Sequence, residues 1–252
     1  MNDSSSTAHM NGKVALVTGG SRGIGRAVVR RLAADGADVA FTYRSDEAAA
    51  ADVVAEVKAL GRRVLAVRAD AASAEAARSA VETAVSEFGR LDVLVNNAGA
   101  GALGPIGDMS LADVDHVIAV NIRGVYLVTQ AAVAHLGEGG RVITIGSCMA
   151  ERAAFPGGTL YATSKAALVG LTKALARELG PAGVTANLVH PGPIDTDMNP
   201  ADGESAPVQA ALTAVGRYGR PSEVADAVAY LAGPGAGYVT GAAVAVDGGF
   251  AA

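Results

Sequence analysis

Tyr161 and Lys165 are the side chains whose types and spacing most directly suggest chemistry. They stand four residues apart at the start of a stretch, running to Leu179, that favours a helix, so both would project from one helix face. A free tyrosine titrates near about 10, and a neighbouring ammonium group favours the phenolate. Lys165 is therefore expected to lower the pKa of Tyr161, which makes the hydroxyl a better acid and base near neutral pH.

Two further polar residues would complete such a site. Ser147 ends an apolar run fourteen residues before Tyr161, and a hydroxyl there can hydrogen-bond a substrate carbonyl oxygen. Asn121 places an amide inside an apolar helical stretch that starts at a capping-box pattern, Ser110 with Asp113, and a buried amide either fixes the fold or holds a water molecule. A serine hydrolase is a weaker interpretation, because the Gly-x-Ser-x-Gly pattern is absent around Ser147.

Short apolar runs alternate with longer amphipathic stretches, which predicts repeated β-α units around a parallel sheet. Several of the runs are continuously apolar, as expected for strands that helices cover on both faces. The prediction is an α/β fold: a single-domain, Rossmann-type, doubly wound parallel sheet of about seven strands. The predicted strands are residues 14–18, 38–43, 63–68, 91–96, 141–146, 185–190 and 243–247.

The turn after the first predicted strand is rich in glycine and leads directly into a helical run. Glycines at such a turn let backbone N–H groups approach a pyrophosphate, and the helix N-terminus supplies a favourable dipole. In this strand-turn-helix setting the turn predicts a nucleotide-binding site, although its Gly-x-x-x-Gly-x-Gly spacing differs from the more common order. The residues concerned are Gly19, Ser21, Arg22, Gly23, Ile24 and Gly25.

The end of the second predicted strand indicates which dinucleotide binds. An NAD-binding domain would place an acidic residue there, on the ribose 2'-hydroxyl, whereas this sequence has Tyr43, Arg44 and Ser45. Arg44, with Arg22, could bind a 2'-phosphate, which favours NADP(H). The alternative is that Arg44 is solvated and Asp46 is the acid of an NAD site.

Bulk composition excludes several classes of protein. Half of the 252 residues are hydrophobic, the net charge is −5, and the basic residues form no runs, so a broad nucleic-acid surface is not expected. One cysteine, Cys148, leaves no disulfide framework or thiolate metal cluster, and no metal site is predicted. No transmembrane span or signal sequence is recognised, so a cytoplasmic enzyme is expected.

The chain divides into three predicted regions. Residues 1–10 are expected to be a disordered tail, and residues 11–252 a single dinucleotide-binding and catalytic domain. Within that domain residues 194–219 form a long irregular stretch after a strand end, where open α/β sheets bind ligands. This stretch is either a substrate lid or an ordinary solvated loop.

Taken together, the motifs resemble the short-chain dehydrogenase/reductase family across the chain after residue 11. The match comprises Thr18-Gly19-x-x-x-Gly23-x-Gly25, Asp70, Asn96-Asn97-Ala98-Gly99, Asn121, Ser147, Tyr161-x-x-x-Lys165 and Pro191-Gly192-Pro193-Ile194-x-Thr196. Within the family, the pattern looks most like 3-oxoacyl-[acyl carrier protein] reductases and related ketone reductases.

The resemblance implies a role for each matched position. Asn121, Ser147, Tyr161 and Lys165 would form a catalytic tetrad, with Asn121 holding a water molecule in a proton relay to Lys165. Asp70 and Ala71 would lie at the adenine, and Lys165 would also hold the nicotinamide ribose. The remaining cofactor contacts would come from Asn97, Ala98, Gly99, Tyr161, Pro191, Gly192, Ile194 and Thr196. The family usually forms homotetramers, and the small residues Ala162, Ala166, Ala167 and Gly170 would let helices approach closely, although that face could instead pack on the sheet.

The resulting hypothesis is an NADPH-dependent reductase that converts a ketone to a secondary alcohol, with Tyr161 as the proton donor. Two alternatives remain: an NAD-dependent alcohol or polyol dehydrogenase, and a dinucleotide-binding protein without catalytic activity.

Overall fold

The structure is a computed structural model that describes residues 9–252, and its centre is one parallel sheet. The seven strands lie in the order β3-β2-β1-β4-β5-β6-β7, with crossovers on both sides of β1. This confirms the predicted doubly wound sheet, and every strand end lies within two residues of its prediction. The strands are β1 (Val14–Val17), β2 (Asp38–Tyr43), β3 (Val64–Arg68), β4 (Val93–Asn96), β5 (Arg141–Ile145), β6 (Thr185–Pro191) and β7 (Ala243–Val246).

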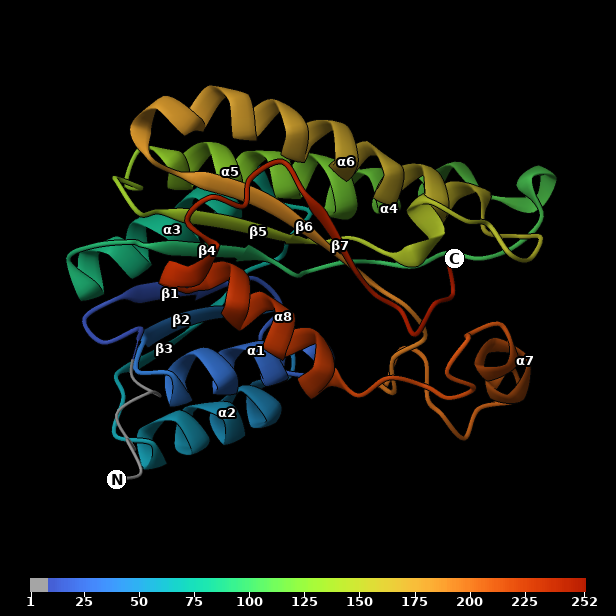
Figure 1. Ribbon diagram of the computed structural model, residues 1–252, viewed down its shortest axis with the longest axis horizontal. Helices are drawn as coiled ribbons and strands as arrows, with labels where there is room; N and C mark the ends of the chain where they lie inside the picture. The colour runs from blue at the N-terminus through green and yellow to red at the C-terminus, as the bar shows by residue number, and fades with distance from the viewer. Residues whose placement is uncertain (1–8) are drawn as a thin grey trace.

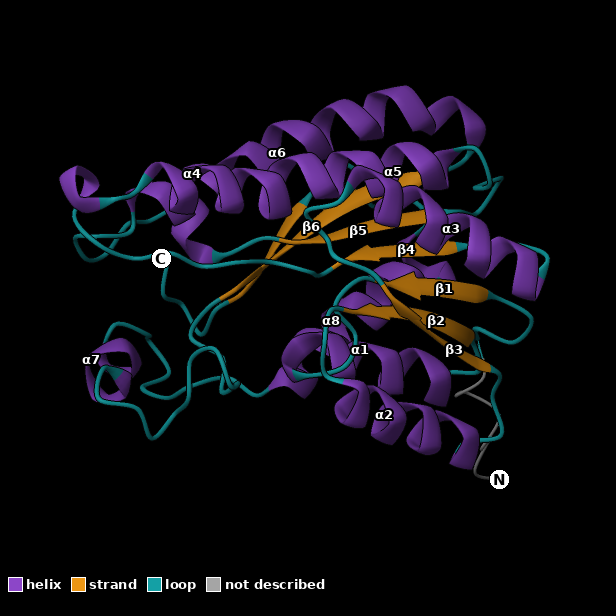
Figure 2. Ribbon diagram, turned by 180° about the vertical axis from the view of Figure 1, so that it is seen from behind, coloured by secondary structure: helices purple, strands orange, loops and turns teal. Residues whose placement is uncertain are grey.

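Helices cover both faces of the sheet, as Figures 1 and 2 show from opposite sides. One layer contains α1 (Gly23–Ala34), α2 (Glu47–Ala59) and α8 (Pro221–Ala232). The other contains α3 (Ala74–Phe88), α4 (Leu111–Ile118), α5 (Val125–Val133) and α6 (Thr159–Leu179). The short helix α7 (Ala206–Ala211) lies away from both layers, beyond the carboxyl end of the sheet.

The central strands contribute to two hydrophobic cores, one on each face of the sheet. In β1, Ala15 and Val17 pack in the core beneath α1 and α8, whereas Val14 and Leu16 pack in the core beneath α3 and α5. Successive side chains of a strand point to opposite faces, so burial of both faces requires a continuous apolar run. The sheet is therefore held rigidly between two layers, and the loops at its carboxyl edge start from fixed positions.

Helices α4 and α5 are parts of one longer stretch, Leu111–Val133, joined by a π-helical turn at Ala119–Gly124. The Ser110 hydroxyl oxygen accepts a hydrogen bond from the Asp113 N–H at 3.1 Å, as the predicted cap requires. Among the described residues, this is one stretch long and apolar enough to cross a membrane, with a mean hydropathy of 1.2. Half of it is buried, and Val128 and Ala132 pack against α3 in the second core. That burial is typical of a core helix.

The segment 194–219 leaves the sheet after β6 and returns to the same place. Its ends meet in a parallel bridge between Ile194 and Gly219, and α7 lies at its far side. Met198, Val208 and Val215 are exposed hydrophobic side chains of this segment. The segment is thus a loop whose two ends lie side by side at the carboxyl edge of the sheet, and it contains a short helix.

The predicted boundary of the N-terminal tail is wrong at Met10. Met10 is buried in the first core, and its N–H donates to the Asp35 carbonyl at 3.0 Å. The apolar side chain of Met10 is stabilised by burial against the core, which a polar tail residue would not be. Residues 1–8 lie outside the described residues.

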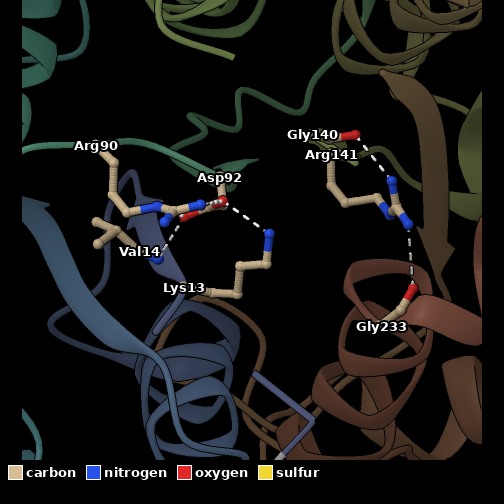
Figure 3. A network of polar contacts seen from close by, with 7 residues as sticks. All are labelled: Lys13, Val14, Arg90, Asp92, Gly140, Arg141 and Gly233. Carbon is tan, nitrogen blue, oxygen red and sulfur yellow. Dashed lines mark hydrogen bonds and ion pairs between the residues drawn. The ribbon is translucent and has the colours of Figure 1, made fainter. Parts of the chain in front are cut away.

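Buried charges at the amino edge of the sheet join neighbouring strands (Figure 3). The Asp92 carboxylate accepts hydrogen bonds from Lys13 Nζ at 3.0 Å, from the Val14 N–H at 2.9 Å and from Arg90 Nη2 at 2.7 Å. Burial would raise the pKa of Asp92, but Arg90, Val14 and Lys13 together outweigh it and lower that pKa. The carboxylate is therefore held ionised between β1 and β4.

We expect Asp92→Asn to lower the free energy of unfolding by about 1–3 kcal/mol at pH 7, because charge-assisted bonds are lost from a buried site. The folded-state pKa of Asp92 is below its ordinary value, so this stabilisation is present above that value and disappears as pH falls through the folded-state pKa. Urea denaturation at fixed protein concentration, from pH 7 into the acid range, measures the difference. Asp202→Asn, at an exposed position, is the matched control; an equal loss in both variants would contradict the prediction.

Candidate active site

Ser147 lies where β5 ends at the carboxyl edge of the sheet. It caps a 3-10 turn, Cys148–Ala150, and its Oγ accepts a hydrogen bond from the Met149 N–H at 3.2 Å. Its own backbone N–H donates to Nδ1 of His190, on the neighbouring strand β6, at 3.0 Å. Ser147 is therefore fixed from both sides.

Tyr161 and Lys165 project from the first turns of α6, as predicted, and the Lys165 Nζ lies 5.7 Å from the centre of the Tyr161 ring. The expected lowering of the tyrosine pKa is wrong for this structure. Burial raises the pKa of Tyr161, and the neighbouring Ser147 hydroxyl offsets only part of the rise. Burial destabilises the phenolate by more free energy than the nearby polar groups provide in stabilising it.

Lys165 is itself shifted by burial. The residue is 4% exposed, and burial lowers its pKa to about 8. Nζ donates to the Ile145 carbonyl at 3.1 Å, at the end of β5. Lys165 therefore titrates at mildly alkaline pH and is mostly charged at neutral pH.

Asn121 lies fully buried in the π-helical turn. Its Oδ1 accepts the Ala100 N–H at 2.8 Å, and its Nδ2 donates to the Ala100 carbonyl and to Ser164 Oγ, each at 2.9 Å. Both amide N–H groups are therefore used by protein acceptors, so the side chain fixes the segment that follows β4. Such π turns occur often at functional sites.

Lys165 and Asn121, two of the four predicted catalytic residues, both lie close to Gly99. A Cβ at this position would lie 3.4 Å from Lys165 Nζ and 3.6 Å from Asn121 Oδ1. The carboxyl ends of β4 and β5 thus bring together the amide, the ammonium group and the two hydroxyls, which the sequence distributes over more than forty residues.

The glycine-rich turn has the geometry that its sequence predicts. Gly19 and Gly23 have φ of 67° and 53°, in the left-handed region that favours glycine. A Cβ at Gly25 would lie 2.1 Å from the Gly19 carbonyl oxygen, so α1 packs directly against the turn. Asn97 Nδ2 donates hydrogen bonds to the carbonyls of Thr18 and Gly19, at 2.9 and 3.0 Å, and these bonds fix the conformation of the turn.

A hollow opens beside this turn, between the carboxyl ends of β1, β2 and β3. Its lining includes the predicted residues Asp70, Ala71 and Ala98, with Thr18 and Thr42 beside them. The hollow lies next to the glycine-rich turn after β1, where the strand order of the sheet reverses. Open α/β sheets bind nucleotides at such a switch point. The glycine-rich turn at this edge therefore fits a dinucleotide.

The residues after β2 distinguish the two cofactor hypotheses. Asp46 is the N-cap of α2, and its Oδ1 accepts the Ala49 N–H at 2.9 Å. Its carboxylate is used locally, which argues against it as the acid of an NAD site. Tyr43 is partly buried at the strand end, and Arg44 and Ser45 are exposed. Arg22 is also exposed, with an ion pair to Asp197 at 3.9 Å.

The segment after β6 lies against the same turn. Pro191 ends β6, Ile194 is buried, and a Cβ at Gly23 would lie 3.3 Å from Thr196 Cγ2. At Gly192 a Cβ would lie 2.7 Å from the Asp247 backbone, so only glycine fits. The remaining predicted turn residues behave as expected for a packed turn: Ser21 is buried and Ile24 packs on the first core.

Several residues that shape the site were not predicted. Thr18 Oγ1 accepts the N–H groups of Asn97 and Ala98, at 2.9 and 3.0 Å, and Thr42 Oγ1 accepts the Gly19 N–H at 3.0 Å. Ser164 bridges Asn121 and the Tyr161 carbonyl. His190 is a polar residue within an apolar run of the sequence, and that contrast could have indicated that it has a role in the site. Cys148 is buried, and its pKa is raised to about 11 by burial, so it is an unreactive core residue.

Comparison with known proteins agrees with this site. The family described as enoyl-(acyl carrier protein) reductase matches residues 19–251. The cyclic-di-GMP-binding biofilm dispersal mediator protein of Escherichia coli is 45% identical over 241 residues, covering 96% of this chain and 98% of the relative. The 3-oxoacyl-[acyl-carrier-protein] reductase of Synechocystis is 41% identical over 243 residues, covering 95% and 97%.

One similar solved structure contains the cofactor. The short-chain dehydrogenase of Burkholderia cenocepacia J2315, in complex with NADP, is 52% identical with a TM-score of 0.96, covering 97% of this chain and all of that chain. With the glycine-rich turn, the open hollow and the tetrad residues at one edge of the sheet, these matches identify the protein's family and cofactor. The chain belongs to the short-chain dehydrogenase/reductase family and is an NADP-dependent oxidoreductase.

Proposed function

We propose that this enzyme reduces a ketone, a 3-oxoacyl thioester or a related carbonyl compound, to a secondary alcohol. The observation that carries the proposal is the meeting of Ser147, Tyr161 and Lys165 at the carboxyl end of β5, with the two hydroxyls as neighbours. The similarity to a 3-oxoacyl-[acyl-carrier-protein] reductase supports the substrate class.

Each residue has a distinct role in this proposal. NADPH, when bound, supplies the hydride. Ser147 and Tyr161 bind the carbonyl oxygen by hydrogen bonds, and Tyr161 donates the proton as negative charge develops on that oxygen. Lys165 holds the nicotinamide ribose and supplies positive charge beside the tyrosine, and Asn121 keeps the Ala100 segment in place.

The protonation state of Tyr161 is compatible with the role of proton donor. Burial raises its pKa, so the phenol is protonated at neutral pH and can donate to a developing alkoxide. The capped Asp46 also removes the support for an NAD-dependent dehydrogenase.

The test follows NADPH and NADH absorbance in parallel with acetoacetyl thioesters, cyclic diketones and aryl ketones. Consumption of NADPH with one of these classes supports the proposal and names the substrate class. Tight NADPH binding with no turnover across the panel would instead favour a dinucleotide-binding protein without catalysis. A preference for NADH over NADPH, together with faster oxidation of the alcohol than reduction of the ketone, would favour a dehydrogenase.

We assign the 2'-phosphate of the cofactor to Arg44 and Arg22, and expect Arg44→Asp to reverse cofactor preference. The aspartate would repel the phosphate and could accept a ribose hydroxyl. The kcat/KM for NADPH should fall by roughly tenfold or more, about 1.4 kcal/mol, while that for NADH is kept or improved. Arg78→Asp, at an exposed position on α3, makes the same charge change away from the site. Equal losses in both variants would exclude the assignment.

We further propose a cytoplasmic homotetramer that binds a small-molecule substrate, with 194–219 as its lid. Ala166, Ala167 and Gly170 are exposed on α6 rather than packed on the sheet, whereas Ala162 packs inward. Small exposed residues let a second helix approach closely. Size-exclusion chromatography with light scattering tests the state: a monomer would exclude this assembly.

A further inference from the structure

His190 is a buried titratable side chain that the proposed reaction does not use. It lies on β6, immediately before Pro191, and is 1% exposed. Its Nδ1 accepts the Ser147 N–H at 3.0 Å, so the neutral ring carries its proton on Nε2. Nε2 has no hydrogen-bond partner within residues 9–252. A buried polar atom without a partner costs free energy, so the ring's position needs another explanation than fold stability.

Gly146 shows that the backbone around Ser147 is fitted to this ring. A Cβ at Gly146 would lie 2.5 Å from His190 Nδ1, closer than any side chain tolerates. The Gly146 N–H donates to the Val189 carbonyl at 2.7 Å, so β5 and β6 stay paired up to the ring. The residue before the serine thus leaves room for an imidazole that holds the serine's own N–H.

Charged groups on three neighbouring elements face the ring. The Glu151 carboxylate, after the 3-10 turn, lies 3.7 Å from Nε2, and Asp247, after β7, also favours the charged imidazole. Lys165, on α6, and burial oppose that charge. Burial is the largest effect and lowers the pKa of His190, which keeps Nδ1 free to accept at neutral pH.

We propose that His190 is a positioning residue that holds Ser147 in its carbonyl-binding orientation, and that protonation of His190 releases Ser147. A charged imidazole has a proton on both nitrogens, so Nδ1 could no longer accept the Ser147 N–H. The Ser147 backbone would then lose the contact on the β6 side, and its hydroxyl would no longer be fixed beside Tyr161. The inference rests on the proposed function, because it assigns Ser147 a role in turnover.

Two substitutions separate positioning from packing. His190→Leu removes the acceptor, leaves a buried N–H unpaired, and should lower kcat by roughly tenfold or more with NADPH affinity within about twofold of wild type. His190→Asn offers an amide oxygen near the Nδ1 position and should restore most of kcat. Rates with an acetoacetyl thioester and NADPH titration by fluorescence measure both. Wild-type kcat in His190→Leu, or equally low kcat in both variants at matched melting temperatures, would overturn the proposal.

The pH profile adds a readout that a structural role would not change. Wild-type kcat should fall on the acid side, below the ordinary range of histidine, and His190→Asn should lack this acid decline. Glu151→Gln removes a carboxylate that favours the charged ring, so it should shift the decline to lower pH. An unchanged acid limb in His190→Asn would overturn the pH-dependent release.

A measurement independent of turnover keeps the inference distinct from the proposed reaction. In uniformly ¹⁵N-labelled protein, long-range proton–nitrogen correlation at pH 7 should show His190 with an unprotonated Nδ1 and a protonated Nε2, assigned by its loss in His190→Asn. On acidification the ring should become doubly protonated and the Ser147 amide resonance should shift with the same midpoint. The opposite tautomer would refute the contact even if ketone reduction is normal. The expected tautomer with no turnover on any carbonyl would refute the proposed reaction alone.

Discussion

Tyr161→Phe is expected to lower kcat by about 10²–10⁴-fold, because positioned proton transfer contributes a factor of that size. The substitution keeps the ring, which packs with Cys148, Met149 and Phe250, and removes only the hydroxyl. The affinity for NADPH should therefore stay within about twofold of the wild type. Initial rates with the carbonyl panel and fluorescence titration of NADPH measure the two quantities separately.

Tyr230→Phe is the matched control for this experiment. Tyr230 is 54% exposed on α8, away from the site, so the loss of its hydroxyl should leave kcat unchanged. Near-normal turnover in Tyr161→Phe would exclude Tyr161 as the proton donor. The wild-type reduction rate should also decline at alkaline pH as the raised pKa of Tyr161 is passed, since the donor proton is then lost.

Gly25→Ala is expected to weaken NADPH binding by at least about tenfold. The new methyl carbon would lie 2.1 Å from the Gly19 carbonyl oxygen and 2.5 Å from Asn97 Nδ2. Neither group can retreat easily, because the Asn97 amide is bonded to the same turn. Overpacking of this kind costs about 1–3 kcal/mol and would move the backbone N–H groups of the turn away from the pyrophosphate. Fluorescence titration of NADPH measures the loss.

Gly137→Ala provides the control for adding a methyl group. A Cβ at Gly137 meets no atom within 4 Å, and the backbone there needs no left-handed conformation. Its NADPH affinity and melting temperature should match the wild type. Unchanged affinity in Gly25→Ala would show that the turn can shift without losing the pyrophosphate, contrary to the prediction.

The strands and most of the site could be predicted because their signals are local. A strand buried on both faces reads as an apolar run, and all seven runs were recognised within two residues of their ends. The order of the site residues follows from the carboxyl edge of the sheet, so Arg44 and Asn97 come directly after a strand and Asp70 and Ser147 two residues after one. Asp46 was left open, although its place before a helical run is itself an N-cap signal.

What could not be predicted depends on contacts between distant parts of the chain. The bond between Ser147 and His190 joins residues on two strands, and no spacing encodes it. The π-helical turn around Asn121 reads as ordinary helix, because one extra residue in a turn leaves the apolar pattern almost unchanged. The pKa of Tyr161 is raised rather than lowered because burial, which the sequence does not show, outweighs the hydrogen bond with Ser147.

The amino edge of the sheet carries stabilising contacts, and the carboxyl edge carries the proposed site. The charged cluster of Asp92 with Lys13 and Arg90 ties the strands at the amino edge, and the reactive side chains all lie at the carboxyl edge. The segment 194–219 is closed where Ile194 meets Gly219, and it is also held by buried Ala206 and Thr213 and by the bond from the Val215 N–H to the Gly248 carbonyl. For directed evolution, a library confined to the exposed positions Met198, Asp202, Glu204 and Val208 would vary substrate range with the least disturbance of the scaffold.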